Sequence, residues 1–221
     1  MRHGYLNATE RVPRGVRKSY TGPDARTRAD TEFGALTRLA DRLPVPVVLD
    51  RSPDGSIVTE FRPGEHGQDL IDAGHAAPVL TSCGRLLRQL HSISAGVLVP
   101  GKHPANHVVV HGDFGPNNTL FDPEAHTVTA LLDWEFAGVG PAIDDVAWCE
   151  WIVRMHHPAA VDSLPSFFDA YGERPPWDAR QRAMVDRCRA LEAFARRWDP
   201  PDDEGVRRWQ ERARATAAFT E

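Results

Sequence analysis

The chain has 221 residues, of which 41% are hydrophobic and 26% charged, a balance that allows a buried core and excludes a disordered tail, a collagen or a repeat array. Residues 1–110 hold 14 Arg/Lys against 11 Asp/Glu, and residues 111–221 hold 12 against 20, so a basic nucleic-acid footprint is absent. The acid-rich second half suits either the attraction of a cationic small molecule or a solvated acidic helical surface.

Three cysteines, Cys83, Cys149 and Cys188, are too few and too scattered for a disulfide framework, and they form no cluster typical of structural zinc. The N-terminal segment lacks the apolar run of a signal peptide, and no stretch approaches the roughly 18 apolar residues that a membrane span needs. We therefore expect a protein of the reducing cytoplasm, neither exported nor inserted into a membrane.

The front of the chain is predicted to be rich in β-strands with one helix. Residues 16–20 alternate like a strand, residues 21–24 form a turn, and apolar residues at helical spacing predict a helix over 25–40. Two further strands, over 44–49 and 56–61, flank the turn Ser52-Pro53-Asp54-Gly55 and indicate a hairpin.

The remainder is predicted to be mainly helical. Apolar residues that recur every three and four positions predict a helix over 78–90 with one buried face. Short apolar strands at 108–110 and 127–132 enclose a polar segment, and helices follow residue 141. The predicted fold class is α+β, with a small β-rich lobe over 1–64 and a larger, mainly helical lobe over 65–221.

The polar segment carries the strongest motif. Residues 111–118 read His-Gly-Asp-Phe-Gly-Pro-Asn-Asn and fit H-x-D-x-x-x-x-N, the catalytic-loop pattern of kinases. Asp133 leaves an apolar strand about twenty residues later, where kinases place their metal-binding aspartate. Asp113 also opens an Asp-Phe-Gly tripeptide, but no acid between Asp72 and Asp113 is available as an upstream catalytic residue. Asp113 is therefore predicted to be the aspartate of the catalytic loop, and Asp133 the metal ligand.

Phosphoryl transfer explains why these residue types are needed, because it depends on positioning and on Mg²⁺ that bridges phosphate oxygens. Asn118 offers an amide oxygen and Asp133 a carboxylate to Mg²⁺, while Asp113 would orient the acceptor hydroxyl and take its proton. The alternative is a structural network of His111 and Asp113, and we expect His111 to brace the loop by hydrogen bonds.

Lysine usage gives an independent indication, because the chain has 24 arginines and only two lysines, Lys18 and Lys102. Lys18 lies on a predicted strand and Glu32 on the helix that follows, which matches the lysine and glutamate pair that holds nucleotide phosphates in kinases. Solvated surface residues are the alternative for both, and Lys102 is expected to be exposed in a turn.

Together these motifs resemble the aminoglycoside phosphotransferase family, small-molecule kinases that share the protein-kinase fold. The similar segments are Leu86-Leu87-Arg88-Gln89-Leu90-His91, His111-Gly112-Asp113 with Asn118, Leu132-Asp133-Trp134-Glu135 and Gly140-Pro141-Ala142-Ile143-Asp144. The resemblance implies ATP or GTP as phosphate donor, Mg²⁺ as cofactor and a structural role for Asp144. It also implies a hinge at Thr59-Glu60-Phe61, where Glu60 and Phe61 would meet the adenine through backbone groups.

Two features depart from the family pattern. Only Gly4-Tyr5-Leu6-Asn7 precedes the strand pair that leads to Lys18, so the loop that covers the phosphates is short and predicts a modest nucleotide affinity. No activation loop or Ala-Pro-Glu segment follows Asp133, which argues against a protein kinase.

The sequence thus predicts an Mg²⁺-dependent O-phosphotransferase that moves the γ-phosphate of ATP or GTP to a hydroxyl of a small molecule. The family resemblance puts an antibiotic acceptor slightly ahead of a metabolite, and Asp145 and Glu150 are candidate contacts for a cationic acceptor or else ordinary surface residues. The alternatives are a metabolic kinase acting on a sugar or amino alcohol, and a catalytically silent kinase-like module that binds nucleotide. Neither a nucleic acid nor a membrane is expected as a partner.

Overall fold

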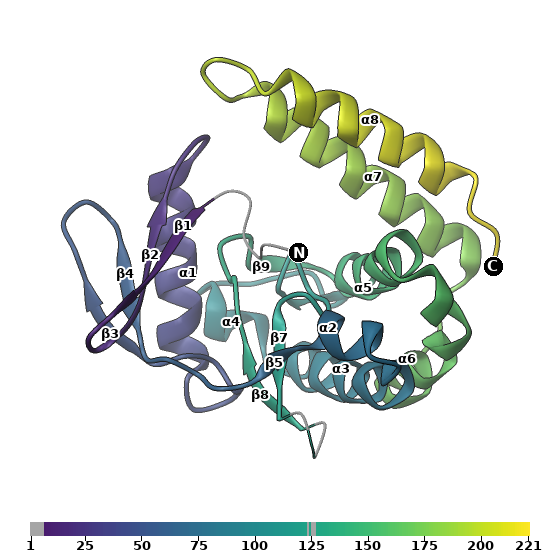
Figure 1. Ribbon diagram of the computed structural model, residues 1–221, viewed down its shortest axis with the longest axis horizontal. Helices are drawn as coiled ribbons and strands as arrows, with labels where there is room; N and C mark the ends of the chain where they lie inside the picture. Colours follow the sequence, from purple (N-terminus) through teal and green to yellow (C-terminus); the bar gives the residue numbers. More distant parts are fainter. Residues whose placement is uncertain (1–6, 123, 125–126) are drawn as a thin grey trace.

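The computed structural model describes residues 7–122, 124 and 127–221. A four-stranded antiparallel sheet lies at one end of the molecule, at the left of Figure 1. Its strands are β1 (Asn7–Val12), β2 (Gly15–Tyr20), β3 (Val48–Arg51) and β4 (Ile57–Thr59), in the order β1-β2-β4-β3. Lys18 pairs with Thr9 on one side and Ile57 on the other, so it lies on a central strand of the sheet. Gly4, Tyr5 and Leu6 of the short predicted phosphate loop lie outside the described residues.

Helix α1 (Ala25–Leu39) packs against this sheet and confirms the predicted helix. Its buried stripe contains Ala29, Ala35, Leu36 and Leu39 at the spacing of one helix face, and Glu32 lies within the same stripe. The predicted strand over 44–49 is shorter than expected, because β3 begins only at Val48. Pro44 and Pro46 lack the N–H groups that a strand donates to its neighbour.

Two small sheets carry the polar segment and its flanks. One has the order β5-β7-β8, from β5 (Glu65–His66), β7 (Thr119–Phe121) and β8 (Val128–Leu131); the other pairs β6 (His107–Val110) with β9 (Gly138–Pro141). The predicted strands at 108–110 and 127–132 are thereby confirmed. Residues 111–118 connect the two sheets, and Asp133 follows the end of β8.

Helices make up the rest of the chain, as predicted. They are α2 (Gly67–Asp72), α3 (Ala76–His91), α4 (Ala95–Leu98), α5 (Ile143–His156), the 3₁₀ helix η1 (Pro158–Ser163), α6 (Leu164–Tyr171), α7 (Trp177–Arg196) and α8 (Asp203–Ala217). The main core gathers apolar side chains of α1, α3, α5 and α6 around Leu87, Phe114 and Trp134. Gly84 lets α3 approach α6 closely, since a Cβ there would lie 2.3 Å from the carbonyl oxygen of Phe167.

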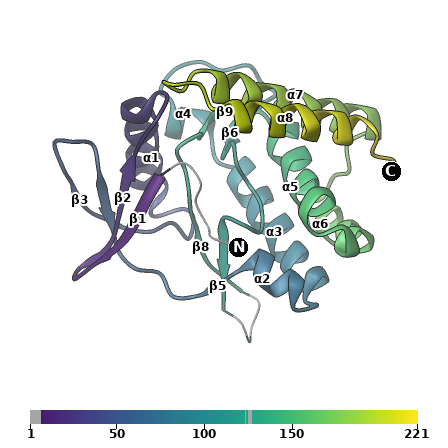
Figure 2. The ribbon, with the colours of Figure 1, turned by 45° about the horizontal axis from the view of Figure 1, so that its top comes forward.

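Helices α7 and α8 pack side by side and reach from α5 back toward the four-stranded sheet (Figures 1 and 2). The connection between them meets the turn before α1, where Arg197 Nη1 lies 2.7 Å from Asp24 Oδ2. A second small core joins α5 to α7 through Trp148, Trp151, Met184 and Cys188. The α7–α8 pair therefore spans the space between the sheet and α5.

The three cysteines are buried and unbridged, in agreement with the absence of a predicted disulfide framework. Among the described residues, none of the helices has the length and apolar character required to cross a membrane.

Candidate active site

The carboxylate of Asp113 is held at both oxygens. Asn118 Nδ2 donates to Asp113 Oδ2 at 2.8 Å and also to the Asp113 carbonyl oxygen at 2.8 Å. Trp148 Nε1, on α5, donates to Asp113 Oδ1 at 2.7 Å. Burial raises the pKa of Asp113, while Arg187 and the Trp148 and Asn118 bonds oppose that rise. A carboxylate oxygen has two lone-pair positions, so Asp113 can still accept a further hydrogen bond from a ligand hydroxyl.

Asp145 holds the loop that carries Asp113 from the buried side of that loop. The carboxylate of Asp145 is fully buried and accepts from the backbone N–H groups of His111 at 2.7 Å and Gly112 at 2.9 Å. His91 Nε2 lies 3.2 Å from the same carboxylate. Two backbone donors and one imidazole thus satisfy a buried charge that would otherwise be costly.

His111 braces the loop by hydrogen bonds, as predicted. Its Nδ1 accepts from the Asp113 N–H at 3.2 Å, so its Nε2 carries the proton and donates to the carbonyl oxygen of Leu132 at 2.8 Å. Burial lowers the pKa of His111, which keeps the ring neutral and fits this tautomer. The imidazole thereby connects the Asp113 loop to the segment that carries Asp133.

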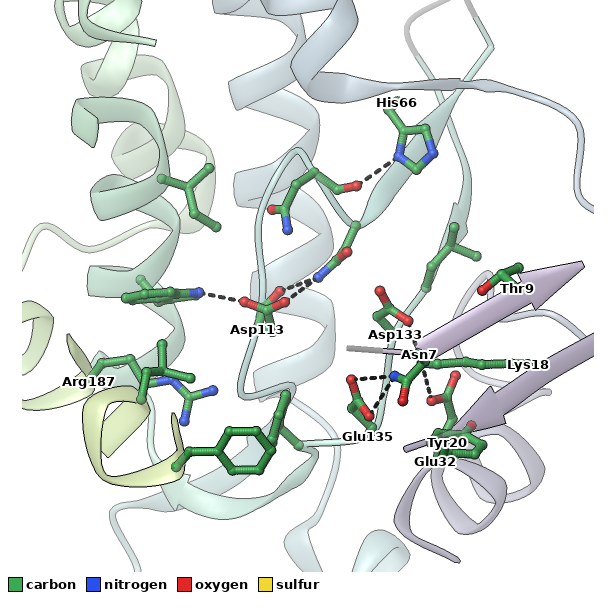
Figure 3. A pocket seen from close by; sticks show the side chains of 18 of the residues that line it. Asn7, Thr9, Lys18, Tyr20, Glu32, His66, Asp113, Asp133, Glu135 and Arg187 are labelled. Carbon is green, nitrogen blue, oxygen red and sulfur yellow. Dashed lines mark hydrogen bonds and ion pairs between the residues drawn. The ribbon is translucent and has the colours of Figure 1, made fainter. Parts of the chain in front are cut away.

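Lys18, Glu32 and Asp133 form one ion cluster beside the central strand β2 (Figure 3). Lys18 Nζ lies 2.6 Å from Glu32 Oε2 and also contacts Asp133 Oδ1. Burial alone would lower the pKa of Lys18, but the neighbouring carboxylates outweigh burial and raise it. Burial likewise acts to raise the pKa of Asp133, and the Lys18 charge and hydrogen bond reverse this and lower it. The lysine is therefore cationic and Asp133 anionic at neutral pH.

Asp133 itself has a left-handed backbone, with φ of 63°, directly after β8. Such a conformation is uncommon for a residue other than glycine and concentrates at functional positions. Trp134, fully buried, holds this turn by donating from Nε1 to the Leu131 carbonyl oxygen at 2.9 Å. The turn directs the Asp133 carboxylate toward Lys18.

A second ion pair beside this cluster joins Arg28 of α1 to Glu135, and both side chains are buried. Asn7 Nδ2 donates to both carboxylate oxygens of Glu135 at 2.9 Å. Glu135 thus ties the start of β1 and helix α1 to the segment after Asp133.

A cavity of about 690 Å³ unites these groups, with Lys18, Glu32, Asp113, Asn118 and Asp133 in its lining. The close-up shows Asp113 between the Lys18 cluster on one side and Arg187 on the other (Figure 3). Five residues selected from the sequence therefore share one cavity, although the charged partners come from segments as far as 115 residues apart.

Asn118 and Asp133 are the oxygen donors available to a magnesium ion. The amide nitrogen of Asn118 is used by Asp113, which leaves its oxygen for a cation. Among the described residues, no three His, Cys, Asp or Glu side chains gather as a complete metal site. This donor set fits Mg²⁺, which is commonly held by one or two protein groups together with phosphate oxygens and water.

The predicted hinge is placed only partly at the cavity. Thr59 lines it, whereas Glu60 and Phe61 do not. The Glu60 N–H donates to the Val47 carbonyl oxygen at 2.9 Å, so it is already used within the protein. Phe61 is 49% exposed and lies under the Arg11 guanidinium, 3.5 Å from its ring centroid. The bonds between Glu60 and Val47 therefore hold Glu60 outside the cavity lining.

The two candidate acceptor contacts are also placed elsewhere. Asp145 is fully buried beneath the loop and takes the structural role that the family resemblance implies for Asp144, which is exposed. Glu150 is fully buried as well, and it pairs with Arg180 and with Arg154. Neither carboxylate lines the cavity, because each binds partners inside the protein.

Several residues of the site were not predicted from the sequence to lie there. They are Asn7, Arg28, Glu135, Trp148 and Arg187. Glu135 had a signal, since it stands two residues after Asp133 in the family-like segment. Trp148 and Arg187 had none, because they reach Asp113 from helices that pack against it only in three dimensions. Arg187 Nη2 donates to the Gly112 carbonyl oxygen at 2.5 Å.

Comparison with known proteins agrees with this arrangement. Residues 97–184 match the sequence model of the Phosphotransferase enzyme family. An aminoglycoside 3'-phosphotransferase from Streptomyces ribosidificus is 39% identical over 167 residues, which cover 75% of this chain and 58% of that protein. The chain spans still less, 18%, of acyl-CoA dehydrogenase family member 10 from Mus musculus, at 25% identity over 193 residues.

Solved structures extend the likeness to nearly the whole chain. A GDP complex of aminoglycoside 2'-phosphotransferase-IIIa has a TM-score of 0.75 at 12% identity and covers 99% of this chain and 91% of that one. A choline/ethanolamine kinase family protein from Mesorhizobium loti has a TM-score of 0.67 at 16% identity, with coverages of 99% and 88%. The fold is thus that of the protein-kinase-like phosphotransferases, as predicted. The resemblance to the aminoglycoside phosphotransferase family is likewise confirmed.

Asp145→Asn tests the brace beneath the loop. An asparagine amide presents only one acceptor oxygen to the two backbone N–H groups, so a buried donor loses its partner. We expect the free energy of unfolding to fall by about 3 kcal/mol, measured by urea denaturation. The matched control is Asp144→Asn on the adjacent exposed residue, which should change it by less than about 0.5 kcal/mol. Equal effects of the two substitutions would contradict the brace.

Proposed function

We propose that the protein is an Mg²⁺-dependent O-phosphotransferase that moves the γ-phosphate of ATP or GTP to a hydroxyl of a small molecule. The observation that carries the proposal is the Asp113 carboxylate, fixed by Asn118 and Trp148 in the same cavity as the Lys18–Glu32–Asp133 cluster. A buried carboxylate and a buried cation that line one cavity support the proposal, because phosphoryl transfer needs a group that accepts a proton and charges that hold phosphates.

Each residue then has a distinct role. Lys18, held by Glu32, binds phosphate oxygens of the nucleotide as a point charge. Asn118 and Asp133 would hold Mg²⁺, which would neutralise charge on the phosphate groups. Asp113 orients the acceptor hydroxyl and accepts its proton, and the Trp148 bond orients that carboxylate and opposes the rise of its pKa on burial.

The proposed nucleotide site extends from the Lys18–Asp133 pair to Thr59 of β4. In the structure Lys18 contacts Asp133 directly, and the nucleotide phosphates would enter beside this pair. Thr59 on β4 lines the cavity and is the residue of the proposed hinge that adenine would approach. Glu60 and Phe61 do not line the cavity and stay in the hinge proposal only through backbone groups other than the Glu60 N–H, which is engaged.

For the acceptor, we propose an antibiotic, aminoglycoside or other, inactivated by phosphorylation. The 39% identity to an aminoglycoside 3'-phosphotransferase supports it. A metabolic kinase acting on an amino alcohol or sugar is the second candidate, favoured by the fold shared with a choline/ethanolamine kinase family protein. Because Asp113, Asn118 and Asp133 are all present, we disfavour the alternative of a catalytically silent kinase-like module.

An intracellular nucleotide donor and three unbridged thiols support action in the cytoplasm.

Mass spectrometry of a panel of antibiotics and hydroxyl metabolites, incubated with the protein, Mg²⁺ and ATP or GTP, tests the reaction. One compound should gain a phosphoryl group. Asp113→Asn should lower turnover by roughly 10² or more, the scale of a lost base, while leaving nucleotide binding nearly intact. Turnover by Asp113→Asn at the wild-type rate would contradict the assignment of the base.

Asp133→Ala tests the metal ligand. Because the substitution removes the carboxylate proposed to hold Mg²⁺, we expect the Mg²⁺-dependent part of ATP binding to disappear in titration calorimetry. Asp162→Ala is the control, since Asp162 is exposed and does not line the cavity. If Asp133→Ala binds Mg·ATP as wild type does, the metal site lies elsewhere.

Trp148→Phe tests how the base is tuned. The base works when ionised, so the rate falls as pH falls through the pKa of Asp113, which burial places above that of an ordinary aspartate. Loss of the indole N–H bond raises this pKa further, so the acid limb of kcat/KM should move to higher pH. Trp151→Phe removes the N–H of the stacked neighbour, which bonds Thr216, and should leave the limb in place. An unmoved limb in Trp148→Phe would refute the tuning.

A further inference from the structure

Arg28 of α1 donates hydrogen bonds from all three of its guanidinium nitrogens to other parts of the protein. Its Nε donates to the Pro23 carbonyl oxygen at 2.9 Å, and its Nη2 donates to the Thr21 carbonyl oxygen. Its Nη1 donates to Asn7 Oδ1 at 3.2 Å and to the carboxylate of Glu135. The residue is only 4% exposed. A guanidinium engaged in this way holds protein segments together rather than a ligand.

Two of the partners of Arg28 line the phosphotransfer cavity together with Lys18 and Asp133. They are Asn7, at the start of β1, and Glu135. Asn7 Nδ2 also donates to both carboxylate oxygens of Glu135 at 2.9 Å, so each of the three side chains bonds the other two. The close-up shows Asn7 and Glu135 beside Asp133 and Lys18 (Figure 3). We call Arg28, Glu135 and Asn7 the Arg28 triad.

The Arg28 triad connects the two sides of the ion cluster by a second route. Arg28 lies one helical turn before Glu32, in the same buried stripe of α1. Glu135 follows Asp133 by two residues, in the segment after β8. The triad thus joins the helix that holds the partner of Lys18 to the segment that carries Asp133, and this route does not pass through Lys18.

A second route matters because the proposed reaction uses the charges of the first one. Lys18 and Asp133 are in direct contact, but the lysine would turn to the phosphates and the aspartate to Mg²⁺ when nucleotide binds. The pair of Arg28 and Glu135 meets no ligand in that reaction. Both of its side chains are buried, and loss of one partner of a buried pair is costly. The pair can therefore keep the two segments aligned while nucleotide is bound.

We infer that Arg28 is a positioning residue of the phosphate site. Through Glu135 and Asn7 it keeps Lys18 and Asp133 at a separation at which one Mg·nucleotide contacts both. The inference rests on the proposed function and adds to it a residue that acts without touching the nucleotide or the metal ion.

The test measures how much Mg²⁺ strengthens nucleotide binding, because this gain depends on Lys18 and Asp133 acting on one ligand. Dissociation constants of the non-hydrolysable ATP analogue AMPPNP are measured by titration calorimetry on the full chain, once with Mg²⁺ and once with EDTA. Their ratio is the Mg²⁺ gain, which expresses the coupling between metal and nucleotide. A merely structural role would lower the fraction of binding-competent protein, which affects both constants equally and leaves the ratio unchanged.

Three variants are compared with the wild type. Arg28→Gln/Glu135→Gln removes both charges of the pair, so neither is left buried without a partner. Arg197→Gln/Asp24→Asn is the matched control, because it removes the ion pair that joins the turn before α1 to the α7–α8 connection, and neither residue lines the cavity. Arg28→Lys keeps a positive charge beside Glu135, but an ammonium group cannot also reach both carbonyl groups of the turn before α1.

The double variant at Arg28 and Glu135 should lower the Mg²⁺ gain by about fivefold or more, and Arg28→Lys by about threefold or more. The control should stay within about twofold of wild type. An unchanged gain in the double variant, or an equal loss in the control, would overturn the inference. A loss in the double variant with none in Arg28→Lys would overturn it too, since that pattern assigns the effect to the Glu135 carboxylate acting on the metal ion.

Circular dichroism shows whether the double variant folds. If it does not, Arg28→Lys decides the inference by the same threshold, because its buried pair stays intact. Failure of the proposed function is distinguishable, since wild-type protein would then show no Mg²⁺ gain before any substitution is made.

Discussion

The ion cluster of Lys18, Glu32 and Asp133 is the interaction on which the site depends. Buried charges are tolerated only when each has a partner, and here one ammonium serves two carboxylates from α1 and from the segment after β8. The cluster therefore fixes the four-stranded sheet, its helix and the end of β8 relative to one another. Beside it, Arg28 and Glu135 form a second buried ion pair, and Glu135 also accepts a hydrogen bond from Asn7 at the start of β1.

Asp113, the proposed base, is held by a different kind of constraint. Asp113 lies on a loop without regular structure, and such a loop is kept in one conformation only if its backbone groups find partners. Asp145 supplies acceptors for two backbone N–H groups, and His111 links the loop to Leu132, one residue before Asp133. The positions of Asp113 and Asp133 are thus coupled through one imidazole. Helix α7 adds Arg187, which bonds Gly112 from the opposite side.

Sequence reasoning predicted the parts of the site that depend on local pattern. The strand of Lys18, the helix of Glu32, the loop of Asp113 and the strand before Asp133 each have a period or motif of their own. It did not predict partners that meet only through packing: Asp145 rather than Asp144 braces the loop, and Glu150 finds Arg180 across 30 residues. Net charge also does not reveal which acids are buried, as Asp145 and Glu150 are. The bonds of Trp148 and Arg187 to the Asp113 loop depend on how α5 and α7 pack, which no local pattern specifies.

We propose that Lys18, Asn118, Asp113 and Asp133 serve one phosphate site. A crystal structure with Mg²⁺ and a non-hydrolysable ATP analogue would test this proposal. We expect the terminal phosphates between Lys18 and Asp133, with the metal ion on oxygens of Asn118 and Asp133 and the γ-phosphate facing Asp113. A nucleotide bound outside this cavity, or a metal ion on other residues, would contradict it.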